Sequence, residues 1–306
     1  FVRRWADHWR SEGLADLLVP VHYSISWCFN LEGGDGKVVL EPAGSYPDWL
    51  PGLIGGAAPN LLEVTARIEE PQGAKGVIEF RLEDISREPG VACNWPKDDA
   101  SKRYDMEISR QYTPDAIWIS EDGLIARTRD PATEATITVA SYDYAGSCKV
   151  LAEARLETDP EHAVAAHYEA LGTPFLSVPQ DDDSNGIADG WERQHELVSC
   201  DPAGDDDDTP KGSGPGDGLS NYEEYRGVLV QDRHVRLDPK VKDLFVYDPD
   251  GLIAASYFED ALRGVKLHYC NAEELRADPP TGAKAHQINA NRSEEHTSEL
   301  QSPNTI

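Results

Sequence analysis

Between residues 61 and 157, apolar and polar positions alternate in short runs, as expected for β-strands with one buried and one exposed face. The run from 135 to 142, Ala-Thr-Ile-Thr-Val-Ala-Ser-Tyr, shows this alternation most clearly. Turn-forming sequences such as Glu121-Asp122-Gly123 separate the runs. We therefore predict seven strands, at 61–68, 76–82, 105–109, 116–120, 124–128, 135–142 and 149–156. Short strands at this close spacing predict a mainly β domain built as a sandwich.

Two further alternating runs, at 21–27 and 37–40, extend this β-rich region toward the N-terminus. The predicted domain then spans residues 19–158. Its strand spacing, and the run at 135–142 that leads into a hairpin, resemble immunoglobulin-like modules of secreted bacterial proteins. The resemblance implies an immunoglobulin-like sandwich and a bacterial protein that is secreted or held at the cell surface.

Helical spacing of apolar residues replaces the alternation in three places. Residues 1–18 predict an N-terminal amphipathic helix, and residues 161–171 predict a helix within a linker at 159–173. Residues 243–247, 252–263 and 265–270 predict a strand, a helix and a strand, the order of a βαβ unit. Because so short a unit buries little core, we interpret 231–291 as the start of a truncated α/β domain.

The last residues, 292–306, have a different origin in our interpretation. The sequence Arg-Ser-Glu-Glu-His-Thr-Ser-Glu-Leu-Gln-Ser, which begins at Arg292, resembles the in-frame translation of a common sequencing-library adapter. We therefore interpret 292–306 as an adapter artefact that takes no part in the fold. The alternative is a genuine polar tail.

Charge narrows the classes of partner. The chain has 306 residues, with 28 Lys and Arg against 56 Asp and Glu, a formal charge of −28. That balance argues against nucleic acid and against an anionic membrane surface as partners. No run of about 18 apolar residues is present, so no membrane span is predicted. Within 174–224 there are 14 acidic residues and only Arg193 and Lys211 to oppose them. A segment this acidic either repels itself into disorder or is neutralised by cations.

The acidic segment contains a calcium-loop motif. Residues 181–192, Asp-Asp-Asp-Ser-Asn-Gly-Ile-Ala-Asp-Gly-Trp-Glu, match the twelve-residue pattern at each specified position. Calcium takes six to eight oxygen ligands, and the glycine at position 6 allows the loop to fold around the ion. The predicted ligands are Asp181, Asp183, Asn185, the backbone carbonyl of Ile187, Asp189 and Glu192. The alternative is a solvated acidic turn.

Residues 217–225 resemble the second half of a weaker second loop. It offers Asp217, Leu219 through its carbonyl, Asn221 and Glu224, with Ser213 and Pro215 where the pattern requires ligands at positions 1 and 3. A second ion would therefore bind weakly or draw on the four aspartates at 205–208, which are otherwise a solvated loop. The segment 217–225 also works as helix-capping sequence without metal.

The flanks of the first loop differ from those of an EF-hand. Pro179 disfavours an entering helix, whereas a helix is predicted to leave the loop at about 188–197. Loop followed by helix resembles dockerin and thrombospondin type 3 calcium repeats, over the acidic region 174–230. The resemblance implies EF-hand-like sites that hold structural Ca²⁺.

Two hypotheses of function follow. The first is a calcium-stabilised extracellular or cell-surface module protein. The second is the accessory N-terminal region of a secreted hydrolase, for example a zinc metallopeptidase, with its catalytic residues beyond the end of this sequence. No HExxH, GxSxG or P-loop motif occurs, so no catalytic residue is predicted and enzymatic activity is left open. Calcium is the one predicted ligand; a protein or carbohydrate partner is not specified.

Overall fold

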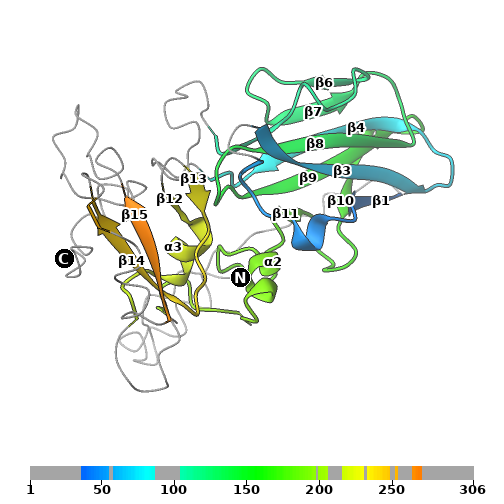
Figure 1. Ribbon diagram of the computed structural model, residues 1–306. Helices are drawn as coiled ribbons and strands as arrows, with labels where there is room; N and C mark the ends of the chain where they lie inside the picture. Colours follow the sequence, from blue (N-terminus) through cyan, green and yellow to red (C-terminus); the bar gives the residue numbers. More distant parts are fainter. Residues whose placement is uncertain are drawn as a thin grey trace, which may run out of the picture. The chain divides into compact units, whose positions relative to one another are not determined.

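The computed structural model describes residues 36–54, 58–86, 104–197, 199–205, 216–230, 233–248, 252–253 and 264–270 (Figure 1). The chain divides into two compact units, Phe1–Gly33 and Gly34–Ile306, and every described residue belongs to the second. The predictions for 1–18, 21–27 and 292–306 lie outside the described residues.

The chain is mainly β. Eleven of the described strands form one sheet with the order β5-β8-β3-β1-β10-β9-β4-β7-β6, in which β2 also pairs with β3 and β11 with β9. Their bounds are β1 Lys37–Pro42, β2 Leu53–Ile54, β3 Ala58–Glu70, β4 Gly76–Glu83, β5 Met106–Ile108, β6 Ile117–Ile119, β7 Ile125–Thr128, β8 Glu134–Ser141, β9 Cys148–Leu156, β10 Asp159–His167 and β11 Leu176–Val178. The seven strands predicted between 61 and 157, and the strand at 37–40, are confirmed.

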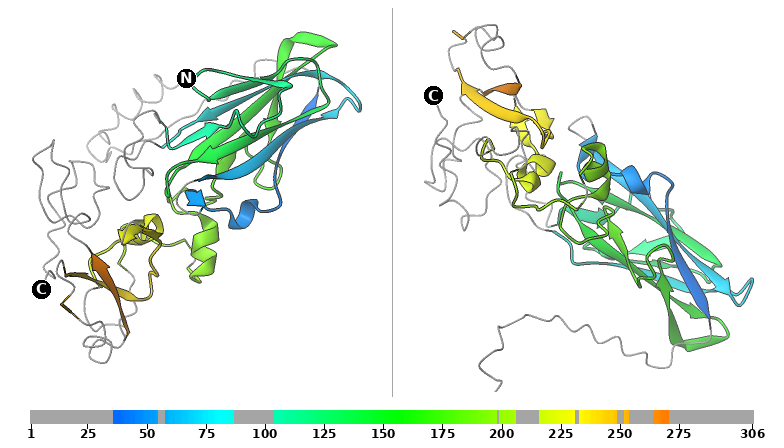
Figure 2. Two further views of the ribbon diagram at one scale, coloured as in Figure 1. Left: turned by 45° about the horizontal axis from the view of Figure 1, so that its top comes forward. Right: turned by 90° about the horizontal axis from the view of Figure 1, so that it is seen from below.

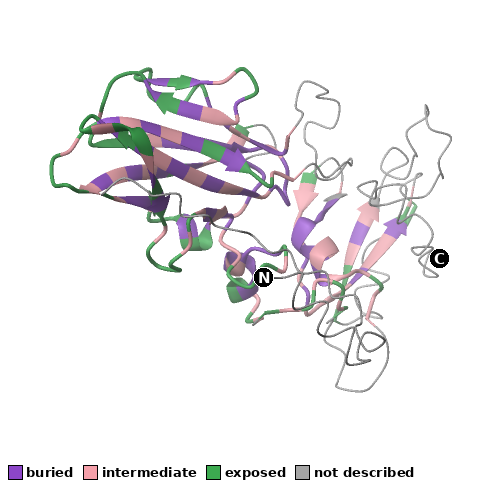
Figure 3. Cartoon of the chain, turned by 180° about the vertical axis from the view of Figure 1, so that it is seen from behind, coloured by how far each residue is buried: buried purple, intermediate pink, exposed green. Residues whose placement is uncertain are grey.

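The sheet folds over so that its two halves enclose one core. In β3, Leu62, Val64 and Ala66 are buried at every second position. In β4, Ile78 and Phe80 are buried in the same way and belong to the same cluster as the β3 residues. Figure 3 shows this alternation of buried and more exposed positions along the strands, and Figure 2 shows the strands from two further sides. A shared core between two strand layers is the arrangement of a β-sandwich.

Strand β10 corrects the prediction of a linking helix at 161–171. The segment pairs antiparallel with β9, where Val164 faces Ala154, and parallel with β1, where Ala166 faces Val38. Its alanine-rich sequence favours a helix in isolation, but tertiary context overrides this weak preference. Buried Val164 and Ala166 alternate on one face, and the strand satisfies the backbone groups of both neighbours. Residues 159–167 of the predicted linker are therefore part of the sheet, and so are residues 176–178, in β11.

A second group of elements follows the sandwich. It contains helix α2 (Asp189–Gln194), helix α3 (Asn221–Arg226), and the antiparallel strands β12 (Val228–Val230) and β13 (Arg233–Val235). Helix α2 confirms the helix predicted to leave the first loop. A separate apolar cluster joins the two helices through Ile187, Ala188, Trp191 and Tyr225, with Ala145 from the turn after β8.

The predicted strands at 243–247 and 265–270 are confirmed as β14 (Lys242–Tyr247) and β15 (Val265–Cys270). They pair in parallel, as strands of a βαβ unit do. The predicted helix between them lies outside the described residues apart from 252 and 253, which are not helical. No helix in the described part of the chain is both long and apolar enough to cross a membrane.

Candidate metal centre

The first acidic loop, 181–192, begins directly after β11 and is shaped by its own short-range hydrogen bonds. The backbone amides of Asn185 and Gly186 donate to the two carboxylate oxygens of Asp181, at 3.1 and 3.0 Å. The amide of Ile187 donates to the side-chain oxygen of Asn185 at 2.7 Å. Gly186 has a φ of +86°, a conformation that side chains rarely adopt. The chain therefore curls inward and carries its acidic side chains with it.

Three carboxylates meet inside this curl. Asp181, Asp183 and Asp189 each place one oxygen within 4.8 Å of those of the other two. Burial raises the pKa of Asp181 to about 6, and the charge of Asp183 adds to this, against the lowering effect of the two amide hydrogen bonds. Burial also raises the pKa of Asp189, and the charges of Asp182 and Glu192 act in the same direction. The loop therefore concentrates negative charge at one point, which a cation would offset.

Of the other predicted ligands, Glu192 lies beside this group but is not one of the carboxylates that meet there. Glu192 is 5% exposed, and its Oε1 accepts hydrogen bonds from the Asn185 side chain at 3.0 Å and from the Cys200 amide at 2.9 Å. The same Asn185 amide group donates to Asp183 at 3.3 Å. The Ile187 side chain is fully buried in the second apolar cluster, so only its backbone is available to an ion. Glu192 thus lies one side chain away from the three aspartates.

Helix α2 holds the end of the loop against the 3₁₀ helix η2 (Tyr46–Asp48). A Cβ added at Gly190 would lie 2.9 Å from the carbonyl oxygen of Pro47, so only glycine fits this contact without a shift. Arg193 donates from the next turn to the same carbonyl. Between these two residues Trp191 is fully buried, with its ring 5.6 Å from that of Tyr225. The position of Asp189 is therefore set by packing as well as by the loop.

The second loop repeats the backbone geometry of the first. Gly218, at position 6, has a φ of +94°, and the amide of Leu219 donates to Asp217 at 2.8 Å, as Ile187 does to Asn185. Asn221 begins helix α3 as Asp189 begins α2, and Glu224 is 1% exposed. The two loops are therefore structural repeats over the part that is described.

Ser213 and Pro215, the residues expected at positions 1 and 3 of this second loop, lie outside the described residues. Asp205 makes the bond that position 1 makes in the first loop: its Oδ2 accepts from the Gly218 amide at 2.9 Å, as Asp181 accepts from Gly186. The other three aspartates of the run at 205–208 lie outside the described part of the chain.

One acidic residue near the second loop was not predicted. Asp243, in β14, joins Asp217 and Glu224 in a second group of carboxylates whose oxygens lie within 4.8 Å of one another. Its backbone amide donates to Asp217 at 2.6 Å. Burial raises the pKa of Asp217, and the charges of Asp243 and Asp205 add to the effect. The sequence carries no signal for this contact, because Asp243 lies in a strand outside the loop motif.

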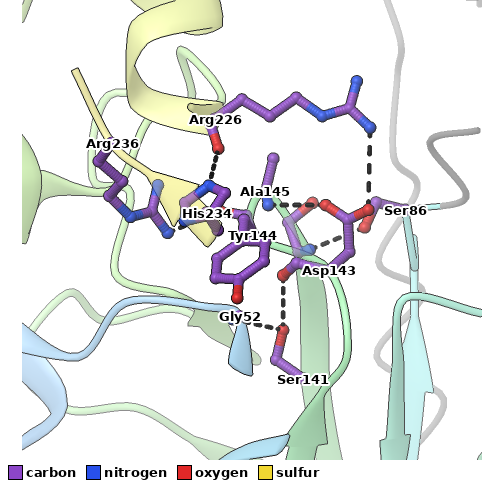
Figure 4. A network of polar contacts seen from close by, with 10 residues as sticks. Gly52, Ser86, Ser141, Asp143, Tyr144, Ala145, Arg226, His234 and Arg236 are labelled. Carbon is purple, nitrogen blue, oxygen red and sulfur yellow. Dashed lines mark hydrogen bonds and ion pairs between the residues drawn. The ribbon is translucent and has the colours of Figure 1, made fainter. Parts of the chain in front are cut away.

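A buried polar network joins the turn after β8 to α3 and β13 (Figure 4). Asp143 Oδ1 accepts from the Ala145 amide at 2.7 Å, and Oδ2 lies 3.8 Å from the Arg226 guanidinium, with side chains only 1% and 5% exposed. The ring of His234 stacks on Tyr144 with centroids 3.3 Å apart, and its Nε2 lies 2.6 Å from the Arg226 carbonyl oxygen. Because a carbonyl only accepts, Nε2 of His234 carries the proton.

His234 leads to a prediction about pH. Burial, with the charge of Arg236, lowers its pKa to about 3 from an ordinary value of 6.5. Between about pH 6.5 and pH 3, His234 is protonated in the unfolded chain but neutral in the folded chain. This contribution to stability is therefore complete above pH 6.5 and is lost as the pH falls toward 3, by at most about 1.4 kcal/mol per pH unit.

We expect His234→Gln to remove this part of the pH dependence. Denaturant unfolding between pH 7 and pH 4 measures it as the difference in slope between wild type and variant. His162→Gln is the control, since His162 is exposed on β10. Equal slopes for the wild type and His234→Gln would contradict the prediction.

Comparisons with known proteins add little to this geometry. No family model matches the chain, and no curated protein matches it. Among solved structures, fragment 1 of the human F-spondin reeler domain is similar with a TM-score of 0.29 and 10% identity, over 46% of this chain and 86% of that one. Fragment 2 gives 0.28 and 11%, over 51% and 100%. The Reelin-N domain of F-spondin gives 0.29 and 10%, over 48% and 87%. These scores carry no argument, and the mainly β architecture rests on the strand pairing itself.

Proposed function

We propose that the chain is a calcium-stabilised extracellular or cell-surface module, in which the loop 181–192 holds one structural Ca²⁺. The observation that carries the proposal is the convergence of Asp181, Asp183 and Asp189 around a glycine with positive φ. Calcium is a hard ion that binds carboxylate, amide and carbonyl oxygens, and these are the groups that the loop offers. Asn185, the Ile187 carbonyl and Glu192 would complete the coordination.

The charge of the loop supports a structural role for the ion. Two of the three converging carboxylates have raised pKa values because they are partly buried beside other negative charges. An ion that binds only the folded loop would remove this repulsion, so its binding free energy would become folding free energy. Dissociation constants of about 10⁻⁴ to 10⁻³ M are typical of extracellular calcium modules, where calcium is millimolar.

The separate cores define what the ion would stabilise. The sandwich, which we propose to be of immunoglobulin-like type, has its own apolar cluster, whereas Ile187 and Trp191 belong to the second one. Loss of calcium should therefore loosen residues around α2 and α3 while the sheet stays folded. Dockerin-like or thrombospondin type 3-like repeats remain our proposal for this region.

A calcium titration of the full chain tests the proposal. At a calcium concentration about 100 times the dissociation constant, we expect about 2.7 kcal/mol of stabilisation of this region over the chelated protein. Limited proteolysis should show cleavage near 181–200 only after chelation. Asp183→Asn should reduce both effects because it removes one of the three converging charges.

Asp182→Asn is the matched control, since Asp182 is exposed in the same loop at a position that is not a ligand in the motif. Its calcium response should lie much closer to that of the wild type than the response of Asp183→Asn does. If about 10 mM calcium, well above the typical range of dissociation constants, changes neither the melting curve nor the cleavage pattern, the loop does not hold a structural ion.

A further inference from the structure

We propose that a second divalent cation site lies between α3 and β14, and that Asp243 completes it together with Asp217 and Glu224. The inference goes beyond the loop 181–192 and rests on the proposed function only for the identity of the ion, calcium. The three side chains come from a loop, a helix and a strand, and each places one oxygen within 4.8 Å of the others.

Burial makes this group different from a solvated acidic turn. Glu224 is 1% exposed and Asp243 is 7% exposed, with a side chain that is entirely covered. Carboxylates that gather in a low-dielectric environment repel one another strongly, and buried charges in proteins are normally paired or bound to metal ions. A cation between these side chains would offset the repulsion, as at the first loop.

The carboxylate of Asp243 supplies an independent observation. One oxygen, Oδ1, is paired with Nε2 of His268 on β15. The other, Oδ2, is buried and has no hydrogen-bond partner among the described residues. A buried acceptor without a donor is costly and points to an absent partner. A bound cation would satisfy it, and His268 would then orient the ligand from its other side, as hydrogen-bond partners of ligating carboxylates do.

Asp243 also supplies a carboxylate that the sequence of the second loop lacks. The motif places Ser213 and Pro215 where carboxylates stand at positions 1 and 3 of the first loop. Asp205, which precedes the loop in the sequence, accepts the hydrogen bond from the Gly218 amide that a position-1 aspartate accepts in the first loop. Asp243 then supplies the third acidic side chain from β14. Two remote aspartates thus replace the two donors that the local sequence lacks.

The site would couple ion binding to the order of the parallel strand pair. Asp217 accepts a hydrogen bond from the Asp243 amide at 2.6 Å, so the loop and β14 already touch at the proposed site. An ion held between them would bind side chains of both α3 and β14. Because Asp243 is also paired with His268, the ion would stabilise β15 as well. We therefore expect calcium to protect β14 and β15 as well as the first loop.

Calorimetric titration of the full chain with calcium tests the assignment. We expect two sites in the wild type and the loss of one, or an affinity lower by about tenfold or more, in Asp243→Asn and in Glu224→Gln. Asp183→Asn should remove the other site instead. Glu223→Gln is the matched control, because Gln preserves the capping box with Ser220 while removing a charge next to Glu224. It should keep both sites.

Hydrogen exchange of the wild type gives a second measurement that needs no variant. Calcium should slow exchange of the amides at 242–247. This result does not depend on whether the variants fold. A wild type with one site that only Asp183→Asn abolishes, or unchanged exchange at 242–247 beside protection at 181–200, would overturn this site and leave the proposed function intact. A wild type that binds no calcium would overturn both. Two unaltered sites in folded Asp243→Asn would also overturn the assignment of Asp243.

Discussion

Replacing Trp191 with alanine is expected to lower the free energy of unfolding of the region around α2 and α3 by about 3–5 kcal/mol. The side chain is fully buried, in contact with Tyr225 and in the same cluster as Ile187. Its loss leaves a cavity in a small core that has few other large side chains to fill it. Because α2 carries both Asp189 and Glu192, the substitution should also weaken calcium binding.

Trp191→Phe separates packing from polarity in this experiment. The indole Nε1 is buried without a hydrogen-bond partner among the described residues, so phenylalanine loses no hydrogen bond there and removes a buried donor. We expect a clearly smaller loss than for alanine. Denaturant unfolding with saturating calcium, followed by circular dichroism, measures both variants. A loss below about 1 kcal/mol for Trp191→Ala would show that this cluster is not closely packed.

The second large effect is expected at the buried ion pair of Arg226 and Asp143. Arg226→Met should destabilise the contact between α3 and the turn after β8 by about 3–5 kcal/mol, because it removes a cation that lies 3.8 Å from the buried Asp143 carboxylate. Both side chains are almost completely covered, so water does not compensate. The same change should expose the turn at 141–146 to proteolysis, since Asp143 also accepts from Ala145 in that turn.

The double variant Asp143→Asn with Arg226→Met is the control for this interpretation. Asparagine keeps an acceptor for the Ala145 amide and carries no charge, so most of the lost stability should return. Equilibrium unfolding of the two single variants and the double variant completes a double-mutant cycle. If the double variant is as unstable as the sum of the single ones, the charge of Asp143 is not the cause.

Strand β10 illustrates why part of the fold was predictable and part was not. The alternation in β3, β4 and β9 is a property of each strand by itself, so it can be found without knowing the neighbours. The residues of β10 alternate only over Val164 and Ala166, among alanines that also suit a helix. Its strand conformation follows from the gap between β1 and β9, which exists only in the assembled sheet.

The acidic loops likewise contain some contacts that the sequence predicts and others that it does not. The curl of the loop 181–192 depends on bonds between residues two to five positions apart, such as those from Gly186 to Asp181 and from Ile187 to Asn185. Such bonds follow from the order of residue types alone, and the motif identified them. The contacts of the Glu192 carboxylate do not all follow from the motif, because it accepts from Asn185 within the loop and from the amide of Cys200, which lies outside the loop.

The sequence by itself determined the mainly β character of residues 37–156, the first loop with its three converging aspartates, and the strong negative charge. The physical reason is that strand alternation and turn hydrogen bonds act within a few residues of one another. Only the tertiary structure decided that β10 joins the two halves of the sheet and that Asp143 meets Arg226. It also brought Asp243 to Glu224. These contacts join segments that are distant in the sequence, and they form because burial and backbone pairing bring those segments together in the folded chain.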